Sequence, residues 1–573
     1  MGEPDSRDAE RQARVAAGVP VALAEKMRSF RPAGERRPVT ALFADVVGST
    51  GLTERMDPED WTAIVNEAFD VMSRAIFRYE GTIARLMGDG ILAFFGAPVA
   101  HEDDPERTVR CALDMVHAID AGLGERVLRE HGAEFRIRAG INTGPVVVGV
   151  VGSDLAYEYT AMGDAVNVAA RMQSAARPGS VLATAATHRF VASIVDATPV
   201  GPLEVKGKAE PIEAFEITGL RARPASVRGL AGIESPMVGR DAQLDELVRA
   251  FAVVRAGRGR AVCVIGEPGI GKSRLLAELR ARAVREVGSL VWIEGRCLSY
   301  GKDLAYHLLT DLVRSAIGVS AAASEAEIRA ALAAGTRELP PGAQADAYAY
   351  LGHLLGVQLA PDELARVSGI EMETVKRYVA SFHQLLRMLT ARAPVVLVCE
   401  DAHWADRSSV DALGQLLSIV DELPVLAMIT ARPDRAAPGW ELVTAAQAMF
   451  GDVLVEIRLA PLTPDDSRAL VGNLLAIESL PERVREFILG KAEGNPFFVE
   501  EVIRMLIDRG AIVRRDDRWV ATSAVEGVEI PDTLHGLLLA RIDRLPESSK
   551  RTLRVASVIG RQFAVRVLRE IVP

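Results

Sequence analysis

The fold of the first third of the chain is decided by residues 82–96, TIARLMGDGILAFFG. Two short apolar runs flank Gly88-Asp89-Gly90, and an Asp-Gly pair between apolar runs is a strong signal for a β-hairpin. Such a hairpin needs partner strands and covering helices, because two strands alone are barely stable in water. The segments on either side of it should therefore supply them.

Outward from the hairpin, the pattern predicts a β-α-β-β-α-β unit. Residues 39–46, VTALFADV, form an apolar strand, and residues 135–152 predict a second hairpin. Helical spacing of apolar residues, opened by Pro, predicts helices over 58–81 and 104–119. This order is the ferredoxin-like plan of an α+β domain, an antiparallel sheet with helices on one face. A helix near 164–176 and strands near 180–184 and 202–217 should follow.

The chain changes character at Met237, where strands, loops and helices begin to alternate, which is typical of a parallel α/β sheet. Residues 303–390 and those beyond about 460 look helical. We expect strands at 261–266, 290–295, 394–400 and 424–430. The predicted organisation is a leader (1–35, with a short helix near 20–29), an α+β domain (36–220), a linker (221–235), an α/β domain (236–455) and a helical region (456–573).

Composition excludes several classes of protein. The 573 residues suffice for about three or four domains. With 49% hydrophobic and 25% charged residues the chain is not disordered. Lys and Arg total 67 against 77 Asp and Glu, a net charge of −10, so no nucleic-acid partner is expected.

The four cysteines lie far apart without a CxxC pair, which excludes a disulfide framework and suits a reducing compartment. The charged start lacks a signal peptide, and no run reaches the ~18 apolar residues of a membrane span. We therefore expect a cytoplasmic protein without a membrane partner. The abrupt end at Pro573 suggests a truncated chain whose absent C-terminal region would bind protein partners.

Two aspartates form the first candidate site. Asp45 ends an apolar strand and Asp89 lies at the hairpin tip, so a ferredoxin-like sheet would bring both carboxylates to one edge. Mg²⁺ takes such oxygen ligands and shares them with substrate phosphates. Taken singly, Asp45 could merely cap a turn and Asp89 could merely serve the hairpin.

Together with their surroundings, these residues carry a family resemblance. FADVVGST (43–50), RLMGDGILAFFGAP (85–98) and YTAMGDAVNVAARMQ (159–173) resemble the class III nucleotide cyclase catalytic domain. The resemblance implies a homodimer, a nucleotide triphosphate substrate and two Mg²⁺ (or Mn²⁺) ions per site. It further implies metal binding at Asp45, Val46 and Asp89, catalysis by Asn167 and Arg171, and substrate binding at Gly48, Ser49, Thr50, Arg85, Thr160 and Lys206.

The purine-selecting pair departs from the family pattern, because Arg85 stands where a Lys is usual. Arg85 can donate to adenine N1, and the hydroxyl of Thr160 can accept from the adenine amine. Guanine would want a carboxylate, which neither residue offers, so ATP is favoured over GTP. Arg and Lys are not equivalent, however, so weak activity or nucleotide binding without turnover stays an alternative.

A phosphate loop forms the second candidate site. Residues 266–273, GEPGIGKS, fit G-x-x-x-x-G-K-[ST] between a strand and a helix. Only eight of the 67 basic residues are Lys, so Lys272 in this motif is informative. It would reach phosphate oxygens while Ser273 binds Mg²⁺. The expected ligands of this Mg-ATP site are Gly266, Gly269, Gly271, Lys272, Ser273, the acidic pair Glu400 and Asp401, and Arg432.

With PMVGRDAQLDEL (236–247) and GNPFFVEEVI (494–503), this loop resembles the AAA-like signalling ATPases of the STAND group. That resemblance implies a slow ATPase switch followed by a helical, winged-helix-like region. The fusion of both parts resembles the soluble adenylyl cyclases and their bacterial relatives. The leading hypothesis is an adenylate cyclase regulated by the ATPase. The alternatives are a nucleotide-sensing signalling ATPase or scaffold with a degenerate cyclase domain, and a guanylate cyclase.

Overall fold

The chain folds as two compact units in the computed structural model: Met1–Gly219 with Ile530–Pro573, and Leu220–Glu529. The structure describes residues 35–53, 56–101, 103–151, 158–162, 164–192, 194–203, 211–221, 236–298, 305–320, 323–367, 371–475, 482–508, 510–515, 518–522 and 552–553.

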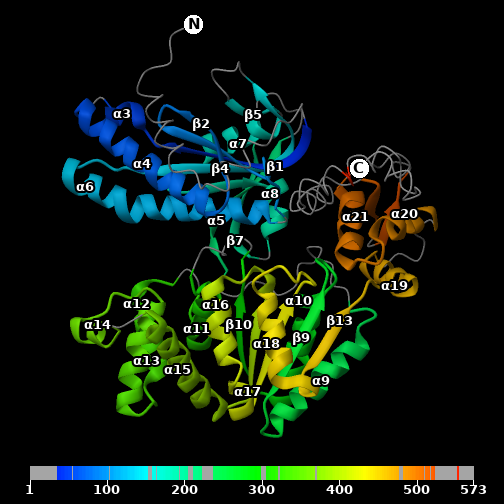
Figure 1. The fold of residues 1–573 in the computed structure, drawn as a ribbon. Coiled ribbons are helices and arrows are strands. Elements are labelled where there is room, and N and C mark those ends of the chain that lie inside the picture. The colour runs from blue at the N-terminus through cyan, green and yellow to red at the C-terminus, as the bar shows by residue number, and fades with distance from the viewer. Residues whose placement is uncertain are drawn as a thin grey trace. The chain divides into compact units, whose positions relative to one another are not determined.

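The first unit is built on the expected ferredoxin-like plan (Figure 1). Its strands lie in the order β2-β3-β1-β4, and β1 pairs antiparallel with both β3 and β4. The prediction made from residues 82–96 is confirmed, with the turn at Gly88 and Asp89. The elements of the plan are β1 (Glu35–Val46), α4 (Pro58–Arg78), β2 (Thr82–Met87), β3 (Gly90–Phe95), α5 (Asp104–Ala118) and β4 (Ile137–Val151).

The expected second hairpin at 135–152 is wrong. These residues form the single long strand β4, which pairs with β1 from Glu35↔Val148 to Val46↔Ile137 without a break. Pro145 does not turn the chain but lies within this ladder, opposite Pro38. The hairpin lies one element later, where β4 pairs antiparallel with β5 (Glu158–Met162).

Helices cover both faces of this sheet, which corrects the expectation of one covered face. All six residues of β3 are buried. On one side, Val39, Ala41 and Phe94 pack against Ala165 and Ala169 of helix α7 (Asp164–Ala175). The helices α4 and α5 also contact the sheet and each other. The first unit further contains α3 (Ser49–Thr53), η1 (Ile119–Gly124), α6 (Glu125–His131), β6 (Val181–Thr184), α8 (Ala185–Val191), β7 (Val195–Leu203) and β8 (Ile212–Leu220).

The second unit is an α/β domain with a parallel sheet, as expected. The order is β10-β11-β12-β9-β13, and every pairing is parallel. The bounds are β9 (Arg260–Gly266), β10 (Val291–Arg296), β11 (Val395–Glu400), β12 (Val425–Ala431) and β13 (Val455–Leu459). The edge strand β13 was not expected, because its charged residues Glu456 and Arg458 interrupt the apolar run.

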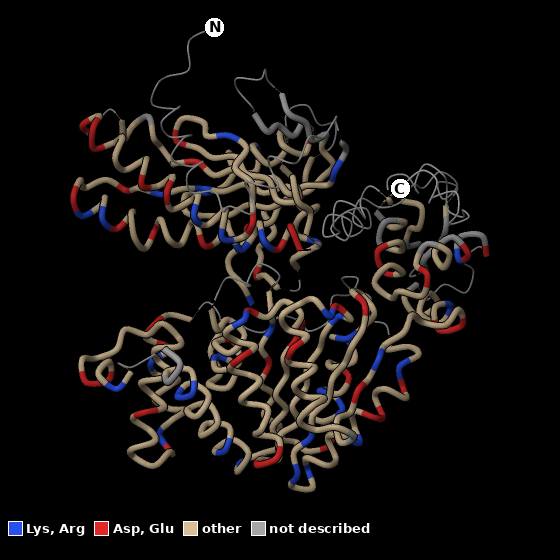
Figure 2. Tube along the Cα trace, in the orientation of Figure 1, with Lys and Arg blue, Asp and Glu red and all other residues tan. Residues whose placement is uncertain are grey.

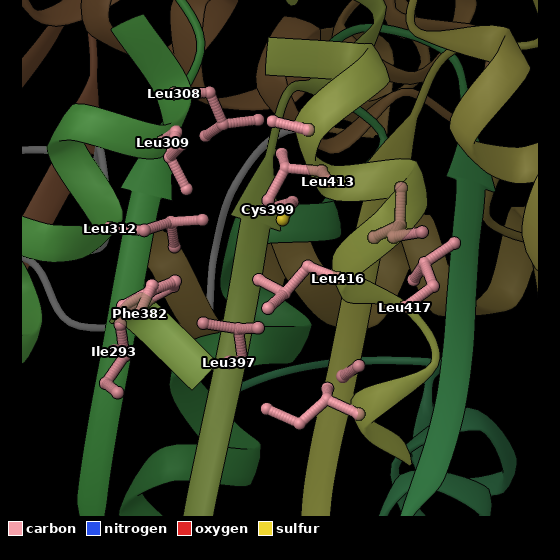
Figure 3. Close-up of a cluster of buried hydrophobic side chains, with 14 of the residues drawn as sticks. Ile293, Leu308, Leu309, Leu312, Phe382, Leu397, Cys399, Leu413, Leu416 and Leu417 are labelled. Carbon is pink, nitrogen blue, oxygen red and sulfur yellow. The ribbon is translucent and has the colours of Figure 1, made fainter. Parts of the chain in front are cut away.

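This sheet separates two hydrophobic cores, because successive strand residues point to opposite faces. Cys263 of β9 belongs to one core, whereas Val262 and Val264 belong to the other. Figure 3 shows the first core, where leucines of α11 (His307–Ile317) and α16 (Arg407–Leu416) meet residues of the sheet. Labelled in it are Leu308, Leu309, Leu312, Leu413 and Leu416 from the helices and Ile293, Leu397 and Cys399 from the strands.

The remaining elements of the second unit are mostly helical, as expected for 303–390 and beyond 460. They are α9 (Asp241–Arg255), α10 (Lys272–Val287), α12 (Glu325–Thr336), α13 (Pro341–Leu354), α14 (Pro361–Val367), α15 (Glu371–Thr390), η2 (Ala402–Trp404), α17 (Ile419–Glu422), α18 (Trp440–Phe450), η3 (Gly451–Val453), α19 (Pro464–Leu475), α20 (Glu482–Ala492), α21 (Pro496–Asp508), β14 (Ile512–Arg515) and β15 (Arg518–Ala521).

Two expectations fall on the ends of the chain. The short helix near residues 20–29 lies outside the described residues. A two-stranded hairpin, β14 and β15, follows α21, but most of the chain beyond residue 522 also lies outside them, so the winged-helix-like region stays a prediction.

Surface and sulfur chemistry match the composition. Acidic residues precede basic ones along α4, whereas both signs are mixed along α5 and α6 (Figure 2). Cys111, Cys263, Cys297 and Cys399 are all buried and unpaired. None of the helices in the described part of the chain combines the length and hydropathy needed to cross a membrane.

Candidate nucleotide sites

The two aspartates predicted to bind metal lie side by side in the first unit. Asp45 pairs with Gly90 in the register of β1 and β3, and Asp89 is the residue before Gly90. A Cβ atom at Gly90 would lie 3.2 Å from both Asp45 Oδ1 and the Ala44 carbonyl oxygen. Glycine at this position therefore leaves room for the Asp45 carboxylate beside the hairpin tip.

The charge of this pair is only partly balanced. Burial raises the pKa of Asp45, and the charge of Asp89 raises it further. Arg138, directly opposite Asp45 in the β1–β4 register, and the backbone N–H of Val46 act in the other direction. Within the described part of the chain, the buried Oδ2 atom of Asp89 has no hydrogen-bond partner. Two crowded carboxylates with a spare oxygen are an arrangement that a cation would relieve.

The residues present fit a divalent cation that takes oxygen ligands. Among the described residues, no group of three or more His, Cys, Asp or Glu side chains is assembled for a metal. A cation on Asp45 and Asp89 would therefore need further ligands from elsewhere. Mg²⁺ commonly binds through one or two carboxylates and completes its shell with water and substrate phosphates.

The structure describes only some of the other predicted cyclase residues. Asn167 and Arg171 are exposed on α7, and Arg85 is exposed on β2. Gly48, with φ +67°, lies in the turn between β1 and the short helix α3, which begins at Ser49. Thr50 belongs to α3 and Thr160 to β5, but their side chains, like all of Lys206, lie outside the described residues.

One further residue, the last of the stretch 159–173, contacts Asp45. The side-chain amide of Gln173, a buried residue near the C-terminal end of α7, donates to Asp45 Oδ2 at 3.3 Å. Sequence reasoning missed it, although a polar residue one position after the buried Met172 of an amphipathic helix was a usable signal.

The phosphate loop of the second unit has the expected strand–loop–helix setting. Gly269 and Gly271 adopt φ of +75° and +102°, which glycine tolerates best. Lys272 is 7% exposed, and its Nζ donates to the carbonyl oxygens of Gly266 at 2.7 Å and Glu267 at 3.1 Å. Burial lowers the pKa of Lys272, against the opposing charges of Asp401 and Glu400. The ammonium group of Lys272 thus donates to carbonyl oxygens of its own loop. A bound phosphate would replace these carbonyl oxygens as its hydrogen-bond partner.

The acidic pair lies where the loop can reach it. Ser273 Oγ donates to Glu400 Oε1 at the end of β11. Burial raises the pKa of Glu400 to about 7. Burial would also raise the pKa of Asp401, but Arg296 and neighbouring cations lower it overall. Arg296 Nε lies 3.6 Å from Asp401 Oδ2, a contact that the sequence did not reveal.

The predicted Arg432 follows β12, beside the acidic pair. Its guanidinium carbon lies 5.3 Å from the ring centroid of Trp404, in the single turn η2. The hydroxyl oxygen of Thr430, two residues before Arg432 in the chain, accepts a hydrogen bond from the backbone N–H of Asp401 at 2.9 Å. Strands β11 and β12 therefore bring Glu400, Asp401 and Arg432 to the same edge as the loop.

A second loop packs against the phosphate loop from the helical region. Asn495 Nδ2 donates to the Pro268 carbonyl at 3.0 Å, and the Phe497 N–H donates to the Gly269 carbonyl at 3.3 Å. Arg240, only 6% exposed, donates to the carbonyls of Ile270 and Ala460. These contacts explain why the motifs around 240 and 495 accompany the phosphate loop in the sequence.

Comparison with known families assigns each of the two candidate sites to a matched stretch of the chain. Residues 32–219 match the family model of the adenylate and guanylate cyclase catalytic domain. Residues 236–429 match the model of an AAA ATPase domain, and residues 463–519 match a domain of unknown function. The chain therefore joins a nucleotide cyclase catalytic domain to an AAA ATPase domain.

Individual relatives cover different parts of the chain. An uncharacterized protein of Rhizobium meliloti (strain 1021) is 29% identical over 94% of this chain and 50% of its own length. Adenylate cyclase 1 of the same organism is 37% identical over 32% of this chain and 28% of its own length. The solved structure of the guanylyl cyclase Cya2 is 32% identical with a TM-score of 0.32, covering 33% of this chain and 95% of that chain. The chain spans half or less of the length of these two curated relatives.

Proposed function

We propose that the cyclase domain converts ATP to 3′,5′-cyclic AMP and pyrophosphate. The observation that carries the proposal is the close approach of Asp45 and Asp89 at the edge of the sheet, with a buried Asp89 oxygen free for a cation among the described residues. The similarity of residues 32–219 to cyclase domains supports the same reaction.

In this reaction the ribose 3′-hydroxyl attacks the α-phosphorus, its proton is lost, and the bond to pyrophosphate breaks. Asp45 and Asp89, with Val46 beside them, would hold Mg²⁺ or Mn²⁺, which when bound lowers the pKa of the hydroxyl and neutralises phosphate charge. Asn167 would orient the ribose, and Arg171 would donate to the oxygens that gain charge in the transition state. Gly48, Ser49 and Thr50 would contact phosphates, and Lys206 the terminal ones.

Both catalytic residues on α7 are exposed, which suits residues that act on a partner's substrate. We propose a head-to-tail homodimer in which each site takes its aspartates from one chain and Asn167 and Arg171 from the other. Two equivalent sites would result. The unpaired buried cysteines agree with the reducing cytoplasm as its location.

The preference for ATP rests on Arg85 and Thr160. A guanidinium can donate to adenine N1, and a threonine hydroxyl can accept from the adenine amine. The relative named adenylate cyclase 1 agrees with this preference. Guanylate cyclase activity is the alternative, but guanine would want a carboxylate acceptor, which neither Arg85 nor Thr160 offers.

The AAA domain would act as a slow ATPase that regulates the cyclase. Its Lys272, Ser273, Glu400 and Asp401 are assembled at one edge of the sheet, ready for Mg-ATP. The same assembly favours a second candidate function, a nucleotide-sensing switch or scaffold with an inactive cyclase. Unchanged cyclase output after Lys272→Ala in the full chain would count against regulation by this domain.

The test is to incubate the full chain with ATP or GTP and Mg²⁺ or Mn²⁺ and to quantify cyclic nucleotides by mass spectrometry. Cyclic AMP should form, and Asp45→Ala should abolish it, while the exposed-site control Asp60→Ala should retain it. An excess of cyclic GMP over cyclic AMP would favour the guanylate cyclase alternative. No product with either metal, with ATP still bound, would favour the switch.

A further inference from the structure

Helix α7 sends one buried polar side chain toward the aspartate pair. Gln173 is 7% exposed, and its Nε2 atom donates to Asp45 Oδ2 at 3.3 Å. The other buried residues of this helix, among them Val168, Ala169 and Met172, are apolar. A buried amide is costly unless it is hydrogen-bonded, so packing alone does not explain a glutamine here.

Three observations show that the backbone of α7 is held closely against β4 around Gln173. A Cβ atom at Gly140 would lie 1.9 Å from the backbone nitrogen of Gln173, so the helix lies directly on the strand. Asn142 Nδ2 donates to the Ala165 carbonyl at 2.9 Å, near the start of the helix. Arg138 donates to the Ser174 carbonyl at 3.0 Å, near its end. Gln173 is therefore held by backbone geometry and not by side-chain packing alone.

A neutral donor suits a carboxylate that must also bind a cation. An amide N–H orients one oxygen of the carboxylate and leaves its negative charge available. A lysine or arginine in the same place would neutralise that charge and compete with the metal. Residues that hold metal ligands in this way commonly change metal affinity by about 10–100-fold when they are removed.

We propose that Gln173 is a positioning residue for Asp45, which holds one carboxylate oxygen so that the other faces Asp89. This inference rests on the proposed metal site of the cyclase domain. It assigns α7 a task within its own chain, in addition to the catalytic task proposed for its exposed residues. The close packing of α7 on Gly140 is then required by the proposed metal site as well as by the fold.

The test compares Mn²⁺ binding by the Gln173→Met variant with binding by the protein that retains Gln173. Binding is measured as the loss of the EPR signal of free Mn²⁺. Both full-length proteins carry Lys272→Ala to weaken the second nucleotide site, and Asp45→Ala defines the signal from the cyclase site. Gln173→Met should bind Mn²⁺ about 10-fold more weakly. The Mn²⁺ concentration for half-maximal cyclase activity should rise by the same factor, while kcat at saturating Mn²⁺ changes little.

The controls distinguish failure of the proposed metal site from failure of the proposed role of Gln173. Gln415→Met, on the exposed surface of α16, should bind Mn²⁺ normally. If Asp45→Ala binds as well as the unmodified protein, the proposed metal site itself is wrong. If Asp45→Ala loses the site while Gln173→Met keeps full affinity, only the role of Gln173 is overturned. Should Gln173→Met unfold, Gln173→Asn keeps the amide but is too short to reach Asp45, and it must show the same weakening.

Discussion

The Nε2 atom of His101 lies 3.0 Å from Oε2 of Glu80, which ties the loop after β3 to the end of α4. On its other side, His101 Nδ1 lies 3.1 Å from Asp104 Oδ1. A ring with a carboxylate at each nitrogen is satisfied only as the doubly protonated imidazolium. Arg107, 1% exposed, joins the same cluster by pairing with Glu80 and Asp103.

The cluster predicts a stability that depends on pH. Burial and Arg107 lower the pKa of His101, but Asp104 and Glu80 raise it overall above its ordinary value of 6.5. The stabilisation is therefore fully present below pH 6.5 and is lost as the pH rises through the higher folded-state value. His101→Gln should destabilise the first unit by about 1–3 kcal/mol at pH 6 and by less at pH 9. Thermal unfolding across this range checks it.

The exposed His131, in the last turn of α6, gives the matched control for that series. His131→Gln should leave the unfolding temperature unchanged at every pH. A constant difference between His101→Gln and the unmodified protein from pH 6 to 9 would show that the imidazolium is not the stabilising form.

Asp45→Asn should have opposite effects on activity and on stability. Burial and the charge of Asp89 raise the pKa of Asp45 above its ordinary value. At neutral pH, the ionised carboxylate of Asp45 therefore destabilises the folded, metal-free protein relative to the unfolded chain. Removing the charge should raise the unfolding temperature of the metal-free protein by about 2 °C. Cyclic nucleotide formation should fall by about 10²–10³-fold, because a metal ligand is lost. A clear drop in the unfolding temperature would contradict the first expectation.

Gly140→Ala should damage the first unit through the backbone of α7. The added Cβ would lie 1.9 Å from Gln173 N and 2.5 Å from the Ala169 carbonyl oxygen, and neither backbone atom can rotate away. We expect a loss of about 3 kcal/mol in the free energy of unfolding by urea. Gly122→Ala, which meets nothing within 4 Å, should stay within about 1 kcal/mol of the unmodified protein.

Gly269→Ala should weaken ATP binding by the phosphate loop. Its Cβ would lie 2.7 Å from Phe497 Cβ and 2.8 Å from Asn495 Oδ1, so the loop and its neighbour must separate. The Kd for a fluorescent ATP analogue should rise by at least about 10-fold, equivalent to about 1.4 kcal/mol. Gly257→Ala has the same kind of positive φ with no contact within 4 Å, and thus isolates the backbone strain. Equal effects of the two variants would disprove the steric argument.

Sequence patterns predicted those features that are local or periodic. The Gly88-Asp89-Gly90 turn and the apolar strands on both sides of it were sufficient to predict the sheet edge at which Asp45 and Asp89 meet. The phosphate loop was predictable for the same reason, because its residues are consecutive. The alternation of apolar strands, loops and helices after Met237 also made the parallel sheet of the second unit predictable.

Features that depend on pairing between distant segments were not predictable. The sequence around Pro145 looks like a turn, and only its long pairing with β1 shows that it is extended. Gln173 contacts a residue 128 positions earlier in the chain, and His101 joins α4 to α5. Such contacts follow from how the elements pack, which one sequence without its fold does not display.

Through its buried Gln173, helix α7 contacts Asp45, the proposed metal ligand of its own chain, and it carries Asn167 and Arg171 at exposed positions. In the proposed homodimer, one rigid helix would therefore serve two reaction centres simultaneously. A shift of that helix along β4 would disturb ion binding in its own chain and charge stabilisation in the neighbour together. The two centres could not be adjusted independently, so any effector that moves α7 should switch the whole dimer as one unit.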